Sequence, residues 1–309
     1  MKIGVVFPSV MYRNGPEDVQ KLIRGIEDIG FDQFDMFDHV VMGYPTETRP
    51  KPFYSPQMPI MEALTMLSYA AAITEKITLG TGVLVLPQRQ IALVAKQVST
   101  LDILSGGRIR LGVGVGWQQS EYEALQENFS TRGRRMDEAI HLLRAYWEDE
   151  HVNFEGIHYQ VDEIAMEPKP TQRGRIPIWV GGTAERTLKR VGELADGWMA
   201  MTLRGDPPLE ESMARVRRYA EAAGRNPESI GMQMSLSPDP LDKERRKKFY
   251  SDPQFLLERM LQLRELGFDQ ASIDCVPIFQ EGYRTVDAML DYLGEIYRKL
   301  KPGLDSKPD

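Results

Sequence analysis

Short apolar runs alternate with amphipathic segments along the whole chain. The runs are rich in β-branched residues and bounded by Gly or Pro, which is typical of strands, whereas the segments between them carry the helical period. The runs predict eight strands, at Lys2–Pro8, Gln33–Val40, Ile77–Leu86, Arg108–Gly116, Ile176–Gly182, Trp198–Leu203, Ser229–Ser235 and Gln270–Pro277. The segments predict eight helices, at Pro16–Ile29, Ile60–Thr74, Ile91–Leu104, Glu121–Asp149, Glu185–Ala195, Leu209–Ala223, Pro253–Leu266 and Val286–Leu300.

Strict alternation of strand and helix favours a (β/α)8 TIM barrel of the α/β class. An open doubly wound sheet normally has about six strands and an early Gly-x-Gly-x-x-Gly turn, and no such turn follows the first strand. We therefore expect one barrel domain over residues 1–309, with insertions at about 42–58 and 152–175. The first insertion follows strand 2, so it belongs to the loops that build active sites at the C-terminal mouth.

Two smaller features complete the expected organisation. Val152–Gln160 alternates apolar and polar residues around Glu155-Gly156, which predicts a small hairpin within the second insertion. The tail Lys301–Asp309 is expected to be flexible.

Composition narrows the classes of partner. The net charge of −7 and the even spread of charged residues argue against nucleic acid. The one dense basic run, Lys243–Lys248, is interpreted as a solvated helix face or loop. No signal peptide and no apolar stretch of about 20 residues is present, so we expect a cytoplasmic protein without a membrane span.

Metal and disulfide chemistry are not expected. The only cysteine, Cys275, excludes an intramolecular disulfide and a Cys-based metal site. Three of the four histidines, His141, His151 and His158, show no shared metal-ligand spacing.

Candidate chemistry lies where strands end, because these ends face the active site of a barrel. Strand 2 ends in Phe37-Asp38-His39-Val40, where His39 suits a general acid or an orienting hydrogen bond. The alternative is a structural histidine at the start of a loop.

Glycine-rich strand ends are the second candidate feature. Two glycines, Gly80 and Gly82, indicate either close approach of a ligand in strand 3 or a kink for barrel curvature. In strand 4 every second residue of Gly112–Gly116 is glycine, which leaves room either for a flat ligand or for bulky neighbours. Trp117 is then a ligand wall or ordinary packing.

Strand 5 leads through Gly181-Gly182-Thr183 into a helix beginning near Glu185. A turn of this kind presents free N–H groups and the positive end of the helix dipole, which favours a phosphate. Thr183 is equally suited to be only an N-cap, with the glycines serving the turn.

Together these segments resemble the luciferase-like monooxygenase superfamily, and within it the coenzyme F420-dependent (deazaflavin) oxidoreductases. The resemblance runs from Met1 to about Thr202 and continues diffusely to the end. It rests on Asp38-His39-Val40, Leu79–Val83, Leu86-Pro87, Ala95–Asp102, Leu104–Arg108, Leu111–Trp117, Glu121, Arg134, Met136-Asp137-Glu138, Pro177–Thr183 and Ala195–Met199.

The resemblance implies a role for each motif residue. His39 would be the catalytic residue, at the redox-active edge of the cofactor, and Asp38 would belong with it to the cofactor site. Gly82-Val83 would form a bulge with a non-prolyl cis peptide that supports the cofactor ring. Gly116 and Trp117 would border the ring and the substrate cavity. Gly181, Gly182 and Thr183 would hold the cofactor phosphate.

One departure bears on the substrate. Sugar-phosphate dehydrogenases of this family have a catalytic Glu where this chain has Trp117, which favours a more apolar substrate pocket. The resemblance favours coenzyme F420, hence hydride transfer to or from a small organic substrate. The alternative cofactor is FMN, in a monooxygenase that uses O2 and receives reduced flavin from a separate reductase. Homodimers are frequent in the family.

Two rivals come from other classes. A metal-dependent hydrolase on the same barrel would need several His and acidic residues at strand ends, where only Asp38-His39 qualifies. A non-catalytic barrel that merely binds the cofactor would share every motif.

Overall fold

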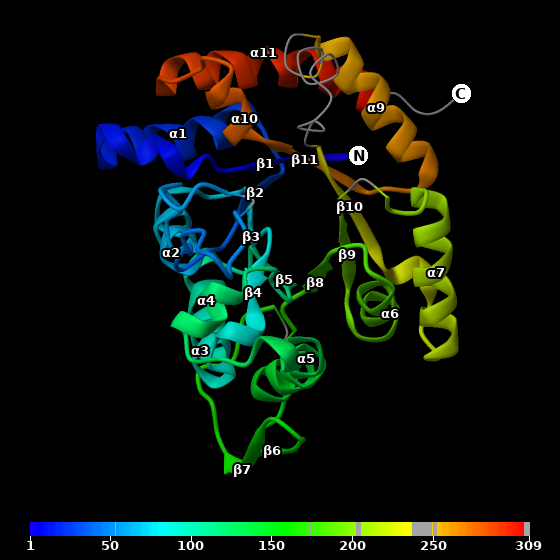
Figure 1. Cartoon of the computed structure of the whole chain (residues 1–309). Helices are drawn as coiled ribbons and strands as arrows, with labels where there is room; N and C mark the ends of the chain where they lie inside the picture. Colours follow the sequence, from blue (N-terminus) through cyan, green and yellow to red (C-terminus); the bar gives the residue numbers. More distant parts are fainter. Residues whose placement is uncertain (53, 173–174, 202–204, 237–248, 250–251, 306–309) are drawn as a thin grey trace.

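The computed structural model describes residues 1–309 apart from 53, 173–174, 202–204, 237–248, 250–251 and 306–309. Short parallel strands form its central sheet (Figure 1). β3 pairs with both β2 and β5, which closes the sheet, and β3 and β4 follow one another in one position, so the barrel has eight strand positions. The predicted fold is confirmed. The strands are β1 Lys2–Val6, β2 Gln33–Met36, β3 Thr78–Thr81, β4 Leu84–Val85, β5 Ile109–Gly114, β8 Ile178–Gly181, β9 Gly197–Ala200, β10 Gly231–Leu236 and β11 Gln270–Asp274.

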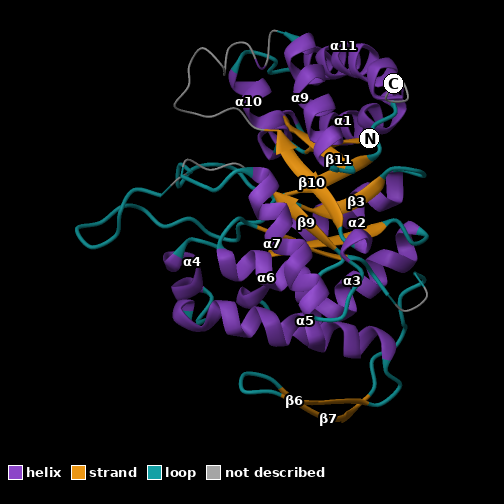
Figure 2. Cartoon of the chain, turned by 90° about the vertical axis from the view of Figure 1, so that its right-hand side faces the viewer, coloured by secondary structure: helices purple, strands orange, loops and turns teal. Residues whose placement is uncertain are grey.

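Helices surround the strands (Figure 2) and bury an apolar layer between themselves and the barrel. The helices are α1 Pro16–Ile29, α2 Ala63–Ile73, α3 Ile91–Ser105, α4 Gln119–Ala124, α5 Arg132–Glu148, α6 Glu185–Leu194, α7 Leu209–Ala222, α9 Pro253–Leu266, α10 Cys275–Gln280 and α11 Val286–Asp305. Short 3-10 turns lie at η1 Ser9–Asn14, η2 Leu86–Gln88, η3 Phe129–Thr131 and η4 Pro227–Ser229. None of the described helices combines the length and apolar character needed to cross a bilayer.

The inside of the barrel holds a buried polar network. Arg110 of β5 and Asp35 of β2 form an ion pair of 3.0 Å. Gln233 of β10 donates hydrogen bonds to Asp35 at 3.0 Å and to Ser272 of β11 at 2.6 Å. Arg110 also reaches Gln270 of β11 at 3.1 Å. Because side chains alternate along a strand, this network identifies which residues of β10 and β11 face the interior.

Several predicted strands end earlier than expected, including the second, third and eighth. β2 stops at Met36, and the third predicted strand is divided into β3 and β4 at Gly82-Val83, where the peptide bond is cis. β11 stops at Asp274, because its carboxylate accepts the Val276 N–H at 3.0 Å and caps α10.

The predicted long helix Glu121–Asp149 is wrong: the chain forms α4 and α5, separated by η3. Gln126 has a positive φ of 59°, which a continuing helix does not allow, and Asn128 caps η3 by accepting the Ser130 N–H at 2.9 Å.

The predicted hairpin is confirmed and is longer than expected. β6 Val152–Glu155 pairs antiparallel with β7 Gln160–Ile164, away from the barrel in both views (Figures 1 and 2). The tail differs from expectation, because α11 continues to Asp305 and Leu304 is buried. Residues 306–309, Thr202 and Leu203 of the sixth predicted strand, and the basic run Lys243–Lys248 lie outside the described residues.

Candidate active site

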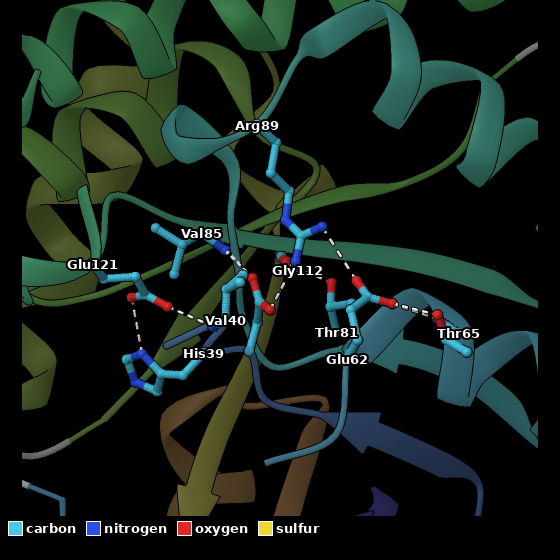
Figure 3. Close-up of polar contacts among 10 residues, drawn as sticks. His39, Val40, Glu62, Thr65, Thr81, Val85, Arg89, Gly112 and Glu121 are labelled. Carbon is cyan, nitrogen blue, oxygen red and sulfur yellow. Dashed lines mark hydrogen bonds and ion pairs between the residues drawn. The ribbon is translucent and has the colours of Figure 1, made fainter. Parts of the chain in front are cut away.

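His39 and Glu121 form a buried pair at the mouth of the barrel (Figure 3). His39 follows β2, and its Nδ1 lies 3.0 Å from Glu121 Oε2. The second carboxylate oxygen, Oε1, accepts the Val40 N–H at 2.5 Å. Glu121 lies on α4, so two segments 82 residues apart in sequence are joined by one carboxylate.

The charge of Glu121 determines which nitrogen of the His39 ring carries a hydrogen. Burial raises the pKa of the Glu121 carboxyl, but the hydrogen bonds from His39 and the Val40 N–H outweigh burial, so the pKa lies below its ordinary value. An ionised carboxylate only accepts hydrogen bonds, so His39 Nδ1 carries the hydrogen. Nε2 then accepts a proton when the ring is neutral and donates one when it is charged.

Two aromatic side chains border His39. Its ring lies 5.4 Å from the Trp117 ring and 5.7 Å from the Tyr54 ring, both in edge-to-face geometry. Tyr54 and Trp117 are 6.1 Å apart. Tyr54 comes from the first insertion, and Trp117 remains 44% exposed. Such exposure of a large ring beside a titratable group leaves an aromatic surface available for a ligand.

The Asp38 carboxylate forms its hydrogen bonds with other residues of the protein. It accepts the Val85 N–H at 3.0 Å and an Arg89 N–H at 2.9 Å. Arg89 also pairs with Glu62 at 3.2 Å, and Glu62 caps α2 through the Thr65 N–H. Asp38 therefore ties the segment after β2 to β4 and to the start of α2, and it is buried.

The glycines around Val83 accommodate its side chain. A Cβ on Gly114 would lie 2.6 Å from one Val83 methyl, and a Cβ on Gly181 would lie 2.7 Å from the other. A Cβ on Gly112 would meet the Thr81 carbonyl oxygen at 2.0 Å. The alternation of glycines in β5 thus makes room for bulky neighbours, which is one of the two interpretations, and the Val83 side chain lies against β5 and β8.

Gly116 serves the turn that carries Trp117 to the mouth. Its φ is +67°, and an added Cβ would meet Val85 at 2.6 Å, so both the backbone and the space require glycine.

The Gly181-Gly182-Thr183 turn lies between β8 and α6. Gly182 has a φ of +122°, and the N-cap residue Ala184 has no side chain that could cap the helix. Thr183 donates a hydrogen bond of 3.1 Å to Asp206, so the hydroxyl faces a carboxylate. Of the two interpretations of Thr183, a side-chain N-cap is wrong, because the cap position is Ala184.

Three residues of the mouth were not singled out as site residues from the sequence. Glu121 belongs to the stretches that carry the family resemblance but stands in no strand-end motif, and Tyr54 lies in a long loop without a motif. Asp274 lies in the middle of the last predicted strand, Gln270–Pro277, and not at its expected end. Its direction follows from Ser272, two residues earlier, which only the structure shows facing the interior of the barrel.

The family model described as "Luciferase-like monooxygenase" matches residues 1–270 of this chain. The chain belongs to this family. It is therefore a luciferase-like oxidoreductase by family, as the resemblance implied.

Several relatives of this family member are known. Rv0940c, an uncharacterized protein of Mycobacterium tuberculosis, is 36% identical over 66% of this chain and 72% of its own length. The F420-dependent glucose-6-phosphate dehydrogenase of Mycolicibacterium gilvum is 26% identical over 88% of this chain and 81% of that protein. Coenzyme F420-dependent tetrahydromethanopterin reductase from Methanopyrus kandleri has a TM-score of 0.73 at 18% identity, covering 97% of this chain and 98% of that chain. At this low sequence identity, the similarity to the reductase shows a shared fold and nothing further.

Proposed function

We propose that this luciferase-like protein is a coenzyme F420-dependent oxidoreductase that transfers a hydride between the deazaflavin and a small organic substrate. The observation that carries the proposal is the His39–Glu121 pair, with Nδ1 held at 3.0 Å and an exposed Trp117 ring beside it. A titratable nitrogen next to an open aromatic surface suits redox chemistry that also moves a proton.

The residues present fit a ring cofactor that carries a phosphate. The Val83 side chain, seated between Gly114 and Gly181, offers an apolar support for a flat ring. The first turn of α6 has no side-chain cap, which leaves its N–H groups for an anion. Asp206 beside Thr183 opposes an anion, and a bound phosphate would have to take over the Thr183 hydroxyl.

When bound, a deazaflavin supplies a two-electron hydride carrier. The protein's own residues would position the substrate and supply or accept its proton. Glu121 orients the His39 ring, and Asp38 holds the strand that carries the Gly82-Val83 bulge. His39 Nε2 would hold a proton at the reacting edge or orient the substrate there.

The substrate we propose is more apolar than a sugar phosphate. Trp117 stands where the resembled sugar-phosphate dehydrogenases have a catalytic Glu. The described mouth adds Tyr54 and the exposed side chains of Val40 and Val41. These side chains favour an uncharged organic molecule.

Parallel binding titrations of the purified protein with coenzyme F420 and with FMN, followed by fluorescence, test the cofactor. Selective binding of F420 at about micromolar dissociation constant or tighter is the expected result. Selective FMN binding would replace the proposal with a monooxygenase that needs a partner reductase. Binding of neither would refute the assignment of Gly181, Gly182 and Thr183 as a phosphate site.

A further inference from the structure

Asp274 faces the interior of the barrel at its C-terminal mouth. Gln270 and Ser272 of β11 both bond to the buried polar network inside the barrel. Because strand side chains alternate with a period of two, Asp274 faces the same side as Ser272. It is also the last residue of its strand, and strand ends form the mouth of a barrel.

The carboxyl group of Asp274 has few partners. One oxygen accepts the Val276 N–H at 3.0 Å, and among the described residues no side chain is found to donate to the other. Burial raises the pKa of Asp274 to about 6, although the Val276 N–H acts in the opposite direction. Both protonation states are therefore accessible near neutral pH.

Tyr54 connects Asp274 to the rest of the mouth. Burial raises the pKa of Tyr54, and the negative charge of Asp274 raises it further. The Tyr54 ring also contacts His39 and Trp117. Burial raises the pKa of the Cys275 thiol, whose side chain is fully buried, and the negative charge of Asp274 raises it further. Asp274 is thus close enough to Tyr54 for its charge to raise the tyrosine pKa, and the Tyr54 ring lies beside His39.

Capping α10 does not account for an ionisable residue at this position. Asn caps a helix about as well as Asp and does not bury a charge. Asp274 is half-buried, and a partly desolvated carboxylate costs free energy, whereas an amide with the same cap hydrogen bond avoids that cost. The choice of Asp indicates a role for its proton.

We propose that Asp274 is a catalytic acid–base residue that exchanges a proton with the oxygen of a substrate hydroxyl or carbonyl group. The proposal rests on the proposed function and names its substrate class: apolar alcohols and the matching ketones. In oxidation, the substrate carbon gives a hydride to oxidised deazaflavin and its hydroxyl gives the proton to the Asp274 carboxylate. In reduction, the carbonyl carbon takes a hydride from reduced deazaflavin and its oxygen takes the proton of the Asp274 carboxyl.

Asp274→Asn is the decisive variant, because Asn keeps the cap and removes the proton. Asp274→Ala removes both, and Asp287→Asn changes an exposed carboxylate on α11 as a matched control. The first readout uses protein without cofactor. A carboxyl whose pKa is raised on folding stabilises the protein below its unfolded pKa, and that contribution is lost as the pH rises through about 6.

The melting temperature of Asp274→Asn should therefore exceed that of wild type by about 2–6 °C at pH 8, and the gap should close near pH 4. A gap independent of pH would overturn the proposal. Asp274→Ala should melt below Asp274→Asn at every pH, because it lacks the cap.

The second readout is turnover with coenzyme F420 and the probes cyclohexanol, cyclohexanone, 2-butanol and 2-butanone. Asp274→Asn should lower kcat by about 10²–10⁴-fold and remove the pH limb near 6, while the dissociation constant for F420 changes less than about twofold. If the variant keeps its kcat and this limb, Asp274 is a cap only and the inference alone fails. A wild type that binds F420 but uses no probe overturns the substrate class. A wild type that does not bind F420 overturns the proposed function and this inference with it.

Discussion

Replacing Glu121 by Gln should lower the turnover of the enzyme strongly while changing its affinity for the cofactor little. The variant keeps the size of the side chain but has one acceptor oxygen instead of two. Glu121 now accepts hydrogen bonds from His39 Nδ1 at 3.0 Å and from the Val40 N–H at 2.5 Å. If the amide oxygen stays with Val40, the amide NH2 faces His39, and Nδ1 must become an acceptor. The hydrogen of the neutral ring then moves to Nε2, the nitrogen left for the substrate.

Two magnitudes follow from these hydrogen bonds. A hydrogen bond to a charged group contributes about 1.5–3 kcal/mol, so the free energy of unfolding should fall by about that amount when the bond between His39 and the carboxylate is removed. Loss of a positioned acid–base group costs about 10²–10⁴-fold in rate, so kcat should fall in that range while cofactor affinity changes little. Since folding lowers the pKa of Glu121, the stability it adds is present above the ordinary value of 4.5 and is lost as the pH falls through the folded-state pKa.

Steady-state kinetics with coenzyme F420, together with thermal melting, check this prediction. Glu123→Gln is the matched control, because Glu123 lies on the same helix and pairs with Arg49 at the surface. A Glu121→Gln enzyme whose kcat stays within about threefold of wild type would refute the tautomer argument. A fall in cofactor affinity as large as the fall in kcat would mean that Glu121 shapes the binding site instead.

Two further variants test the cofactor site. Gly114→Ala places a methyl carbon 2.6 Å from Val83, so the bulge must shift and affinity for F420 should fall about tenfold, from roughly 1–3 kcal/mol of overpacking. Gly133→Ala, whose methyl would meet only Arg190 at 3.8 Å, should bind normally; equal losses in both would refute the role of Val83. Asp206→Asn should raise affinity for F420 about fivefold, since like charges about 4 Å apart in water repel by roughly 1 kcal/mol. Binding of riboflavin, which has no phosphate, should not change; an equal gain for riboflavin contradicts the phosphate assignment.

The fold was largely predictable because its signals are local. Pro16–Ile29 and Pro253–Leu266 were predicted to the residue, since Pro begins each helix and a left-handed Gly ends it. The long helix from Glu121 was predicted wrongly, because its interruption depends on a positive φ at Gln126 that no strong breaker marks. Strand ends were overestimated, because Gly82-Val83 and Cys275–Pro277 are apolar enough to resemble strand.

The candidate site was predictable in part. His39 and the glycine positions stand in strand-end motifs that can be recognised in one segment. Glu121 and Tyr54 contact residues remote in sequence, and Asp274 is placed at the mouth only by the inward direction of its strand, so no local pattern ties these three residues to the site.

The sequence by itself determined the alternation of strand and helix, hence the barrel and the edge at which chemistry occurs, because periodicity and turn residues act over a few positions. Only the tertiary structure decided what each mouth residue contacts. The glycines of β5 receive Thr81 and Val83, Asp38 binds Val85 and Arg89, and Glu121 holds the ring of His39. Such contacts join segments tens of residues apart, and they exist only once closure of the barrel brings the strand ends together.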